Sequence, residues 1–178
     1  MDDTQIIAET CRWLERAVIG LNLCPFAAGP YRAGRVHLVV SHERSAAGLS
    51  RDLELAMLEL CAASLRQRET TLLIHPWVLN DFSAYNVFLD VCDALVARLG
   101  LVGELQVASF HPDYQFAGTA PQDIENFTNR SPFPTLHLLR EASVSRAVDS
   151  TNTADIYLNN IEALRGLGHA GWNDLWRG

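Results

Sequence analysis

Lysine is absent from this chain: all fourteen basic residues among its 178 are arginine. The absence excludes a lysine Schiff base and the lysine of a P-loop, because both chemistries need a primary amine. Any side-chain cation that holds an anion in this protein must therefore be an arginine or a histidine.

Three other missing features exclude further classes of protein. No apolar run approaches the roughly 18 residues that a membrane helix needs, and no charged start followed by an apolar segment marks a secretory signal. The net charge is −7, without a basic stripe that would match a phosphate backbone. We therefore expect a cytoplasmic protein that binds neither nucleic acid nor membrane, and the oligomeric state stays open.

The four cysteines include no C-x-x-C pair, so neither a zinc ribbon nor a redox dithiol is indicated. Cys11, Cys61 and Cys92 fall within expected helices, where we expect reduced, buried thiols. Cys24 instead stands in a loop, directly before Pro25. It is a candidate nucleophile if a histidine lies beside it in the fold, and the alternative is a small apolar residue that fills a tight turn.

The hydrophobic pattern predicts an alternation of strands and helices in the middle of the chain. Strands are expected at 35–41, 70–75 and 104–110. Helices are expected between them, at 46–67 and from an N-cap at Asn80 or Asp81 to Leu99. This βαβαβ order implies a parallel sheet with right-handed crossovers. The fold class is therefore α/β, with a short, mainly parallel sheet and flanking helices.

The rest of the chain adds helices at both ends and one long loop. We expect a first helix at 4–19 with Thr4 as its N-cap, a helix from about Pro134 to Val148, and a last helix capped by Asn152 or Thr153. The loop between His111 and Ser131 has little regular pattern, which is often a sign of function. The length fits a single α/β domain spanning residues 1–178.

Each of the three expected strands ends at a histidine, namely His42, His75 and His111. If the strands are parallel, the histidines share the carboxyl edge of the sheet, where open α/β sheets place their ligands. His75 and His111 are each followed by proline, which ends a central strand and keeps the preceding residue extended. We expect these two to share one site. The alternative is that each merely caps its strand and bonds a loop carbonyl.

Asp113 follows His111 by two residues and faces the same side if the chain stays extended. A carboxylate beside an imidazole orients the ring and raises its basicity. Together with His75, the pair could also supply the ligands of a divalent metal. Against both hypotheses, His-Pro-Asp is a common turn composition.

Arg130 precedes two prolines that preset the start of the helix expected near Pro134. An arginine beside a helix N-terminus suits an anion. The alternative is a capped helix with an exposed arginine, and aromatic residues nearby that belong to the core. The candidate substrate-binding residues are Arg130, Ser131, Asn129, Tyr114, Gln115 and Trp77.

Four stretches of the sequence, 18–27, 73–79, 110–119 and 126–141, resemble a bacterial family, domain of unknown function fourteen-fifteen. The resemblance runs over nearly the whole chain. It implies no particular activity, cofactor or catalytic residue. His42 lies outside these stretches, which weakens it as a shared site residue.

The leading hypothesis is a small cytoplasmic enzyme, with hydrolase or transferase chemistry favoured, that acts on a small anionic metabolite. In this hypothesis His111 is the general base or a metal ligand, Asp113 orients it, and His75 is a second base or ligand. Arg130 binds the substrate, and Cys24 is the candidate nucleophile. The alternatives are a non-catalytic module that binds a ligand or a partner protein, and a metal-binding protein.

Overall fold

A four-stranded sheet forms the centre of the computed structural model, which describes residues 1–148 and 153–177. Three strands point the same way and one runs opposite to them. The three expected strands are present, and the α/β class is confirmed. In spatial order the strands are β1 (Val36–Val40), β2 (Thr70–Ile74), β4 (Thr135–Arg140) and β3 (Leu105–Phe110).

Strand β4 occupies the segment where the sequence predicts the start of a helix, so that prediction is wrong. The helix begins only at Glu141. β4 pairs antiparallel with β2 on one side and with β3 on the other. The prediction that β2 and β3 are neighbours is therefore wrong. The central position explains the strand: Leu136 and Leu138 are fully buried on one face of the sheet, while His137 lies on the other.

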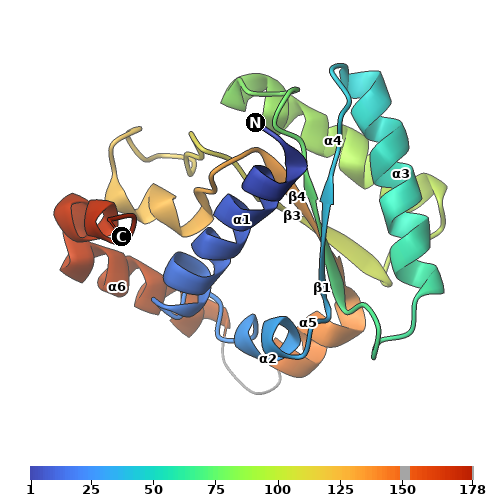
Figure 1. Ribbon diagram of the computed structural model, residues 1–178. Helices are drawn as coiled ribbons and strands as arrows, with labels where there is room; N and C mark the ends of the chain where they lie inside the picture. The colour runs from blue at the N-terminus through green and yellow to red at the C-terminus, as the bar shows by residue number, and fades with distance from the viewer. Residues whose placement is uncertain (149–152, 178) are drawn as a thin grey trace.

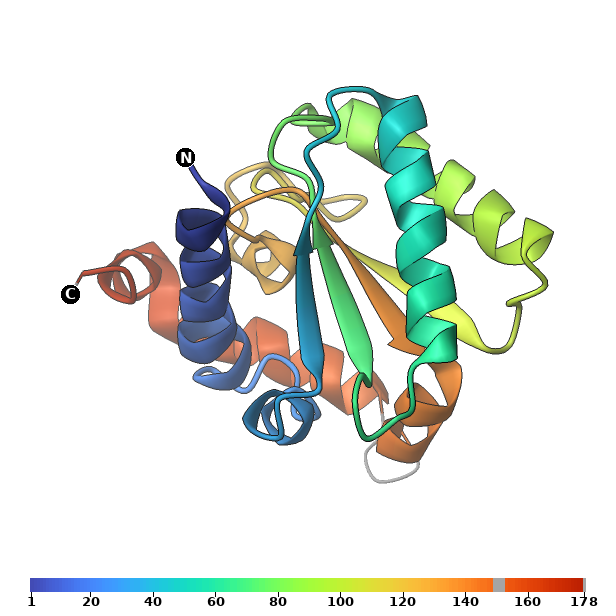
Figure 2. The ribbon, with the colours of Figure 1, turned by 45° about the vertical axis from the view of Figure 1, so that its right-hand side comes forward.

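Helices cover both faces of the sheet (Figures 1 and 2). Helices α3 and α4 lie against one face, and α1, α2 and α6 lie on the side of the other. In the part of the chain that the structure describes, no helix has the length and apolar character needed to cross a bilayer. The helices are α1 (Asp3–Trp13), the π-helix η1 (Leu14–Ile19), α2 (Ala28–Arg32), α3 (Ala46–Ala62), α4 (Phe82–Arg98), the 3₁₀ helix η2 (Ile124–Asn129), α5 (Glu141–Val148) and α6 (Thr153–Asp174).

The predicted N-cap is correct for α4 and wrong for α1. Asp81, one of the two expected caps of α4, accepts a backbone N–H at 2.8 Å. Asp2 rather than Thr4 caps α1, through a capping box in which Asp2 and Gln5 each bond the other's backbone N–H. Asn152, one of the caps predicted for the last helix, lies outside the described residues.

Two apolar cores lie on opposite faces of the sheet. The core under α3 and α4 is closely packed around residues such as Leu53, Met57 and Leu136, all fully buried. The second core lies between the sheet, α1, η1 and α6, and includes Trp13 and Leu72. The second core is the one that borders a cavity.

Tyr85 of α4 bonds the paired ends of β3 and β4. Its ring is fully buried, and its hydroxyl donates to Thr135 O at 2.9 Å and accepts the Phe110 N–H at 3.1 Å. These groups belong to the first residue of β4 and the last residue of β3. One hydroxyl therefore satisfies two backbone groups at the edge of the sheet.

Replacing Tyr85 by phenylalanine should destabilise the protein by about 2 kcal/mol, because the change leaves a buried donor and a buried acceptor without partners. Denaturant unfolding measures the loss. Tyr157→Phe is the matched control, since Tyr157 is half exposed, and should change the free energy of unfolding by less than about 0.5 kcal/mol. Equal effects of the two substitutions would contradict the role given to the Tyr85 hydroxyl.

Candidate functional site

The structure brings two of the predicted site residues, His75 and His111, to the same buried corner at the end of β2 and β3. Both are inaccessible to solvent, and both rings pack against Tyr85, with centroid distances of 5.7 Å for His75 and 5.0 Å for His111. Phe82 also contacts the ring of His111. The corner is therefore an aromatic cluster closed to water.

The hydrogen bonds of these histidines match the simpler alternative, in which each bonds a loop carbonyl. His75 Nδ1 lies 3.0 Å from Val78 O, and His111 Nε2 lies 3.2 Å from Leu79 O. His111 Nδ1 accepts the backbone N–H of Asp113 at 3.0 Å. Both ring nitrogens of His111 are thus engaged, and Asp113 orients the ring through its backbone.

Burial lowers the pKa of both imidazoles, and that of His75 falls to about 4. Both are therefore neutral near pH 7. His75 Nε2 is buried without a hydrogen-bond partner among the described residues. The same part of the chain contains no group of three His, Cys, Asp or Glu side chains arranged to hold a metal. The structure thus gives no support to the metal site hypothesised at His75, His111 and Asp113.

His42 stays apart from this corner. It is exposed, stacks on Trp77 with a centroid distance of 5.0 Å, and lies 3.0 Å from Asp3 Oδ2. Trp77 is therefore engaged with a surface histidine. The three strand-ending histidines do not form one set.

Arg130 holds the long loop together. Its Nε donates to Tyr114 O at 3.3 Å, its Nη2 donates to Pro121 O, and the guanidinium carbon lies 4.3 Å from the centre of the Phe127 ring. The helix expected near Pro134 to complete an anion site beside Arg130 is strand β4 instead. Three other candidate binding residues also make bonds to main-chain carbonyls: Asn129 to Ser109 O, Gln115 to Thr119 O and Ser131 to Phe133 O.

Asn126 organises the same loop from inside. It is fully buried, accepts the Phe116 N–H at 2.9 Å and the Thr119 hydroxyl at 2.8 Å, and donates to Ala120 O at 2.8 Å. A buried amide with this many partners fixes a loop that has little regular structure. The conformation of the loop is therefore largely explained by internal bonds.

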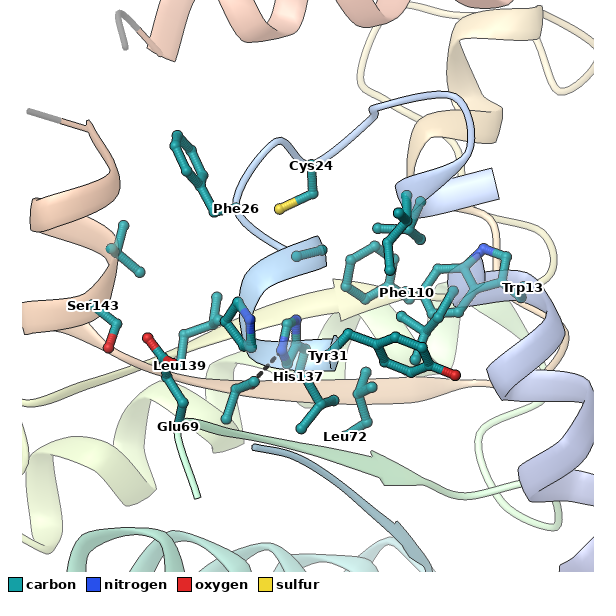
Figure 3. Close-up of a pocket in the computed structure, with 18 of the residues that line it drawn as sticks. Trp13, Cys24, Phe26, Tyr31, Glu69, Leu72, Phe110, His137, Leu139 and Ser143 are labelled. Atoms are coloured by element: carbon teal, nitrogen blue, oxygen red, sulfur yellow. Dashed lines mark hydrogen bonds between the residues drawn. The ribbon is translucent and has the colours of Figure 1, made fainter. Parts of the chain in front are cut away.

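The cavity lies on the opposite face of β2 and β4 from α3 and α4 (Figure 3). Its volume is about 240 Å³, and its walls come from the sheet, η1, the loop before α2, and α5. Most of the lining is aliphatic or aromatic. The side chains that carry polar atoms include Cys24, Tyr31, Glu69, Thr70, Gln106, His137 and Ser143.

A π-helix and a strained turn bring Cys24 to this cavity. At Gly20, directly after η1, a Cβ atom would lie 2.3 Å from Arg16 O, so only glycine fits. Asn22 then takes a left-handed conformation with φ of 54°, and the Cys24 N–H bonds Val18 O at 3.3 Å. π-helices are rare in proteins, but those that occur lie frequently at functional sites. The geometry of this turn therefore explains why glycine stands at position 20 and asparagine at position 22, just before Cys24.

Cys24 is one of the cavity-lining residues, and Figure 3 shows its sulfur pointing toward the space above the sheet. Burial raises the pKa of its thiol, and hydrogen bonding by the backbone N–H groups of Phe26 and Ala27 offsets this in part. The predicted partners His75 and His111 do not line the cavity. The imidazole that shares it with Cys24 is that of His137.

His137 rises from the sheet into the cavity, and its neighbour Thr70 determines its tautomer (Figure 3). The Thr70 hydroxyl donates to Leu138 O at 2.8 Å and is hydrogen-bonded to His137 Nε2. With the hydroxyl proton donated to Leu138 O, the bond to Thr70 uses a proton on Nε2, and this is the tautomer that we assign to His137. Burial lowers the pKa of His137 to about 4, so the ring is neutral near pH 7. Nδ1 is then an acceptor, without a partner among the described residues.

Glu69 is the charged side chain among the described residues that line the cavity, and it pairs with Arg35 at 3.3 Å. Within the described residues, no arginine lines the cavity. This part of the lining therefore offers no arginine to the anionic ligand expected from the sequence.

Sequence reasoning missed His137 and Thr70 as site residues. His137 belongs to a segment interpreted as a helix, although Leu136, His137 and Leu138 alternate between the two faces as in a strand. That alternation was the available signal. Thr70 and His137 are 67 residues apart in the sequence, so the local pattern could not predict their hydrogen bond.

Comparison with known proteins assigns the family. The family model described as protein of unknown function, DUF1415, matches residues 5–174. The chain belongs to this family. No curated protein and no solved structure matches it.

Lowering the pH should destabilise the protein between about pH 6.5 and 4. His75 has a folded pKa of about 4, below the ordinary value of 6.5, so the unfolded chain takes up a proton that the folded chain refuses. His75 alone contributes a loss of at most roughly 3 kcal/mol, complete by about pH 4. Unfolding free energies at pH 6.5 and pH 4.5 measure the slope.

His137 contributes in the same direction, because its pKa is also about 4. His137→Phe should therefore reduce the dependence of the unfolding free energy on pH. An identical slope in the wild type and in His137→Phe would show that His137 does not contribute to the loss of stability at low pH.

Proposed function

We propose that this protein binds a small, uncharged, largely apolar molecule in the cavity over β2 and β4, and that the ligand donates a hydrogen bond to His137 Nδ1. The observation that carries the proposal is the acceptor nitrogen itself. His137 lines the cavity, so a ligand hydroxyl or N–H group held there would meet an acceptor that no described residue already bonds.

The size and the charge of the cavity restrict the ligand further. Its volume of about 240 Å³ is below the range of drug-sized ligand sites, which begins near 300 Å³. An apolar wall favours burial of a ring or a short aliphatic body. Glu69 is already paired with Arg35, and no arginine of the described residues lines the cavity to bind a carboxylate or a phosphate. These features support the non-catalytic, ligand-binding hypothesis over binding of an anionic metabolite.

Catalysis is the second candidate function, and the thiol of Cys24 in the cavity is the observation that favours it. A hydrolase or transferase would use Cys24 as nucleophile, with His137 Nδ1 as the acceptor of its proton. The pKa values of the resting site oppose this step, since the thiol pKa is raised and the imidazole pKa is lowered. An enzyme of this kind would need its ligand to change these pKa values.

Indole and benzothiophene test the binding proposal, because they have similar shapes and only indole has an N–H donor. Indole should bind about tenfold more tightly, since its donor meets the free acceptor. Calorimetry gives the affinities, and the shift in melting temperature confirms that the folded state binds.

Two variants assign the preference to the cavity. His137→Phe keeps an aromatic ring and removes the acceptor, so indole and benzothiophene should bind it equally. Thr70→Val removes the group that determines the tautomer and should reduce the preference. Absence of binding by both compounds, or an unchanged preference in His137→Phe, would refute the proposal.

Cys24 should react slowly with iodoacetamide at pH 7.5, because burial keeps its thiol protonated. Mass spectrometry of the labelled peptide gives the rate, and a free cysteine in solution provides the reference. Labelling of Cys24 faster than the reference would contradict the raised pKa and favour the enzymatic function. Acceleration by an added ligand would favour it in the same way.

A further inference from the structure

A groove lies beside the cavity and differs from it in its lining, which includes two arginines. It has a volume of about 450 Å³ and lies between α1, the loop after β3 and the end of α6. Figure 1 shows the C-terminal end of α6 and the η2 segment on the same side of α1. Trp13 borders both hollows. The lining residues of the groove are Glu9, Arg12, Trp13, Pro112, Phe127, Arg130, Ser131, Pro132, Trp172 and Trp176.

Aromatic rings form one wall of the groove. Phe127 and Trp172 meet edge to face with centroids 5.0 Å apart, and Trp172 meets Trp176 in the same way at 5.6 Å. Trp172 is largely buried, so its position is set by packing. Indole and phenyl faces held in this way suit a planar apolar group.

Two arginines supply donors to the same groove. Arg130 is held by two loop carbonyls and by the Phe127 ring, which leaves Nη1 without an acceptor among the described residues. Arg12, in the last turn of α1, has no side-chain ion pair or hydrogen bond with any of the described residues. A fixed guanidinium and a free one across an aromatic wall are the donors that planar carboxylates use.

Two carboxylates near the groove oppose the binding of an anion. Glu9 lines the groove one turn before Arg12, and Asp113 lies near enough to Arg130 to raise its pKa against the lowering by burial. Neither forms an ion pair with these arginines within the described residues. Arg12 and Arg130 thus keep donors for a ligand.

From this arrangement we propose that the groove is a second ligand site, which binds a planar aromatic carboxylate between Arg12, Arg130 and the tryptophan wall. The site is independent of the cavity. The groove binds an anion, whereas the cavity binds a neutral molecule. Arg130 thus binds an anion as the sequence predicts, but without the helix that was expected beside it.

The probe is 4-iodobenzoate, with 4-iodobenzamide as its uncharged counterpart. The carboxylate should bind at least about tenfold more tightly at low salt, and its iodine should quench tryptophan fluorescence. Arg12→Gln should weaken binding of the carboxylate at least about fivefold, and Glu9→Gln should strengthen it, because each change alters one neighbouring charge. Arg66→Gln, an exposed arginine outside the groove, is the control and should change nothing.

Equal affinity for the acid and the amide would overturn the proposal. So would an affinity that stays the same in both Arg12→Gln and Glu9→Gln. Loss of 4-iodobenzoate binding in His137→Phe with no loss in Arg12→Gln would place the probe in the cavity and would also refute a second site.

Discussion

The antiparallel insertion of β4 between β2 and β3 is the constraint on which the rest of the structure depends. It separates the two strands that the chain order suggests are adjacent, and it gives both a hydrogen-bonding neighbour. Because alternate side chains of a strand face opposite sides, β4 sends Leu136 and Leu138 into one core and His137 toward the other. One strand thus completes the sheet and supplies the central polar group of the cavity.

The two sides of the sheet have different physical roles. Toward α3 and α4 the buried surface is closely packed, and its few polar groups, such as the Tyr85 hydroxyl and the two histidines beside it, bond backbone atoms. Toward α1 and η1 the packing is interrupted by a cavity and, beyond Trp13, by an open groove. The first side stabilises the fold, and the second side offers space for ligands. The interruption begins where the regular α1 helix widens into η1.

The sequence was sufficient for the elements whose signals are local. Strands β1, β2 and β3, the cap at Asp81 and the α/β class follow from hydrophobic period and capping chemistry. It was insufficient for β4, because leucine and arginine are good helix formers and only two distant partners make this segment a strand. The π-helix η1 was missed for a similar reason, since its apolar residues repeat much as in an α-helix. His75 and His111 do meet in space, but their bonds to Val78 and Leu79 could not be deduced from the His-Pro pattern.

Nitrogen-15 NMR of the histidine rings determines whether His137 presents a neutral Nδ1 acceptor to the cavity. Near pH 7 we expect the Nε2–H tautomer for His137, with an unbonded Nδ1 resonance that moves when indole is added. Titration should leave the ring neutral down to about pH 4. A proton on Nδ1, a charged ring at pH 6, or an Nδ1 resonance that indole does not affect would show that His137 is not the acceptor of the cavity.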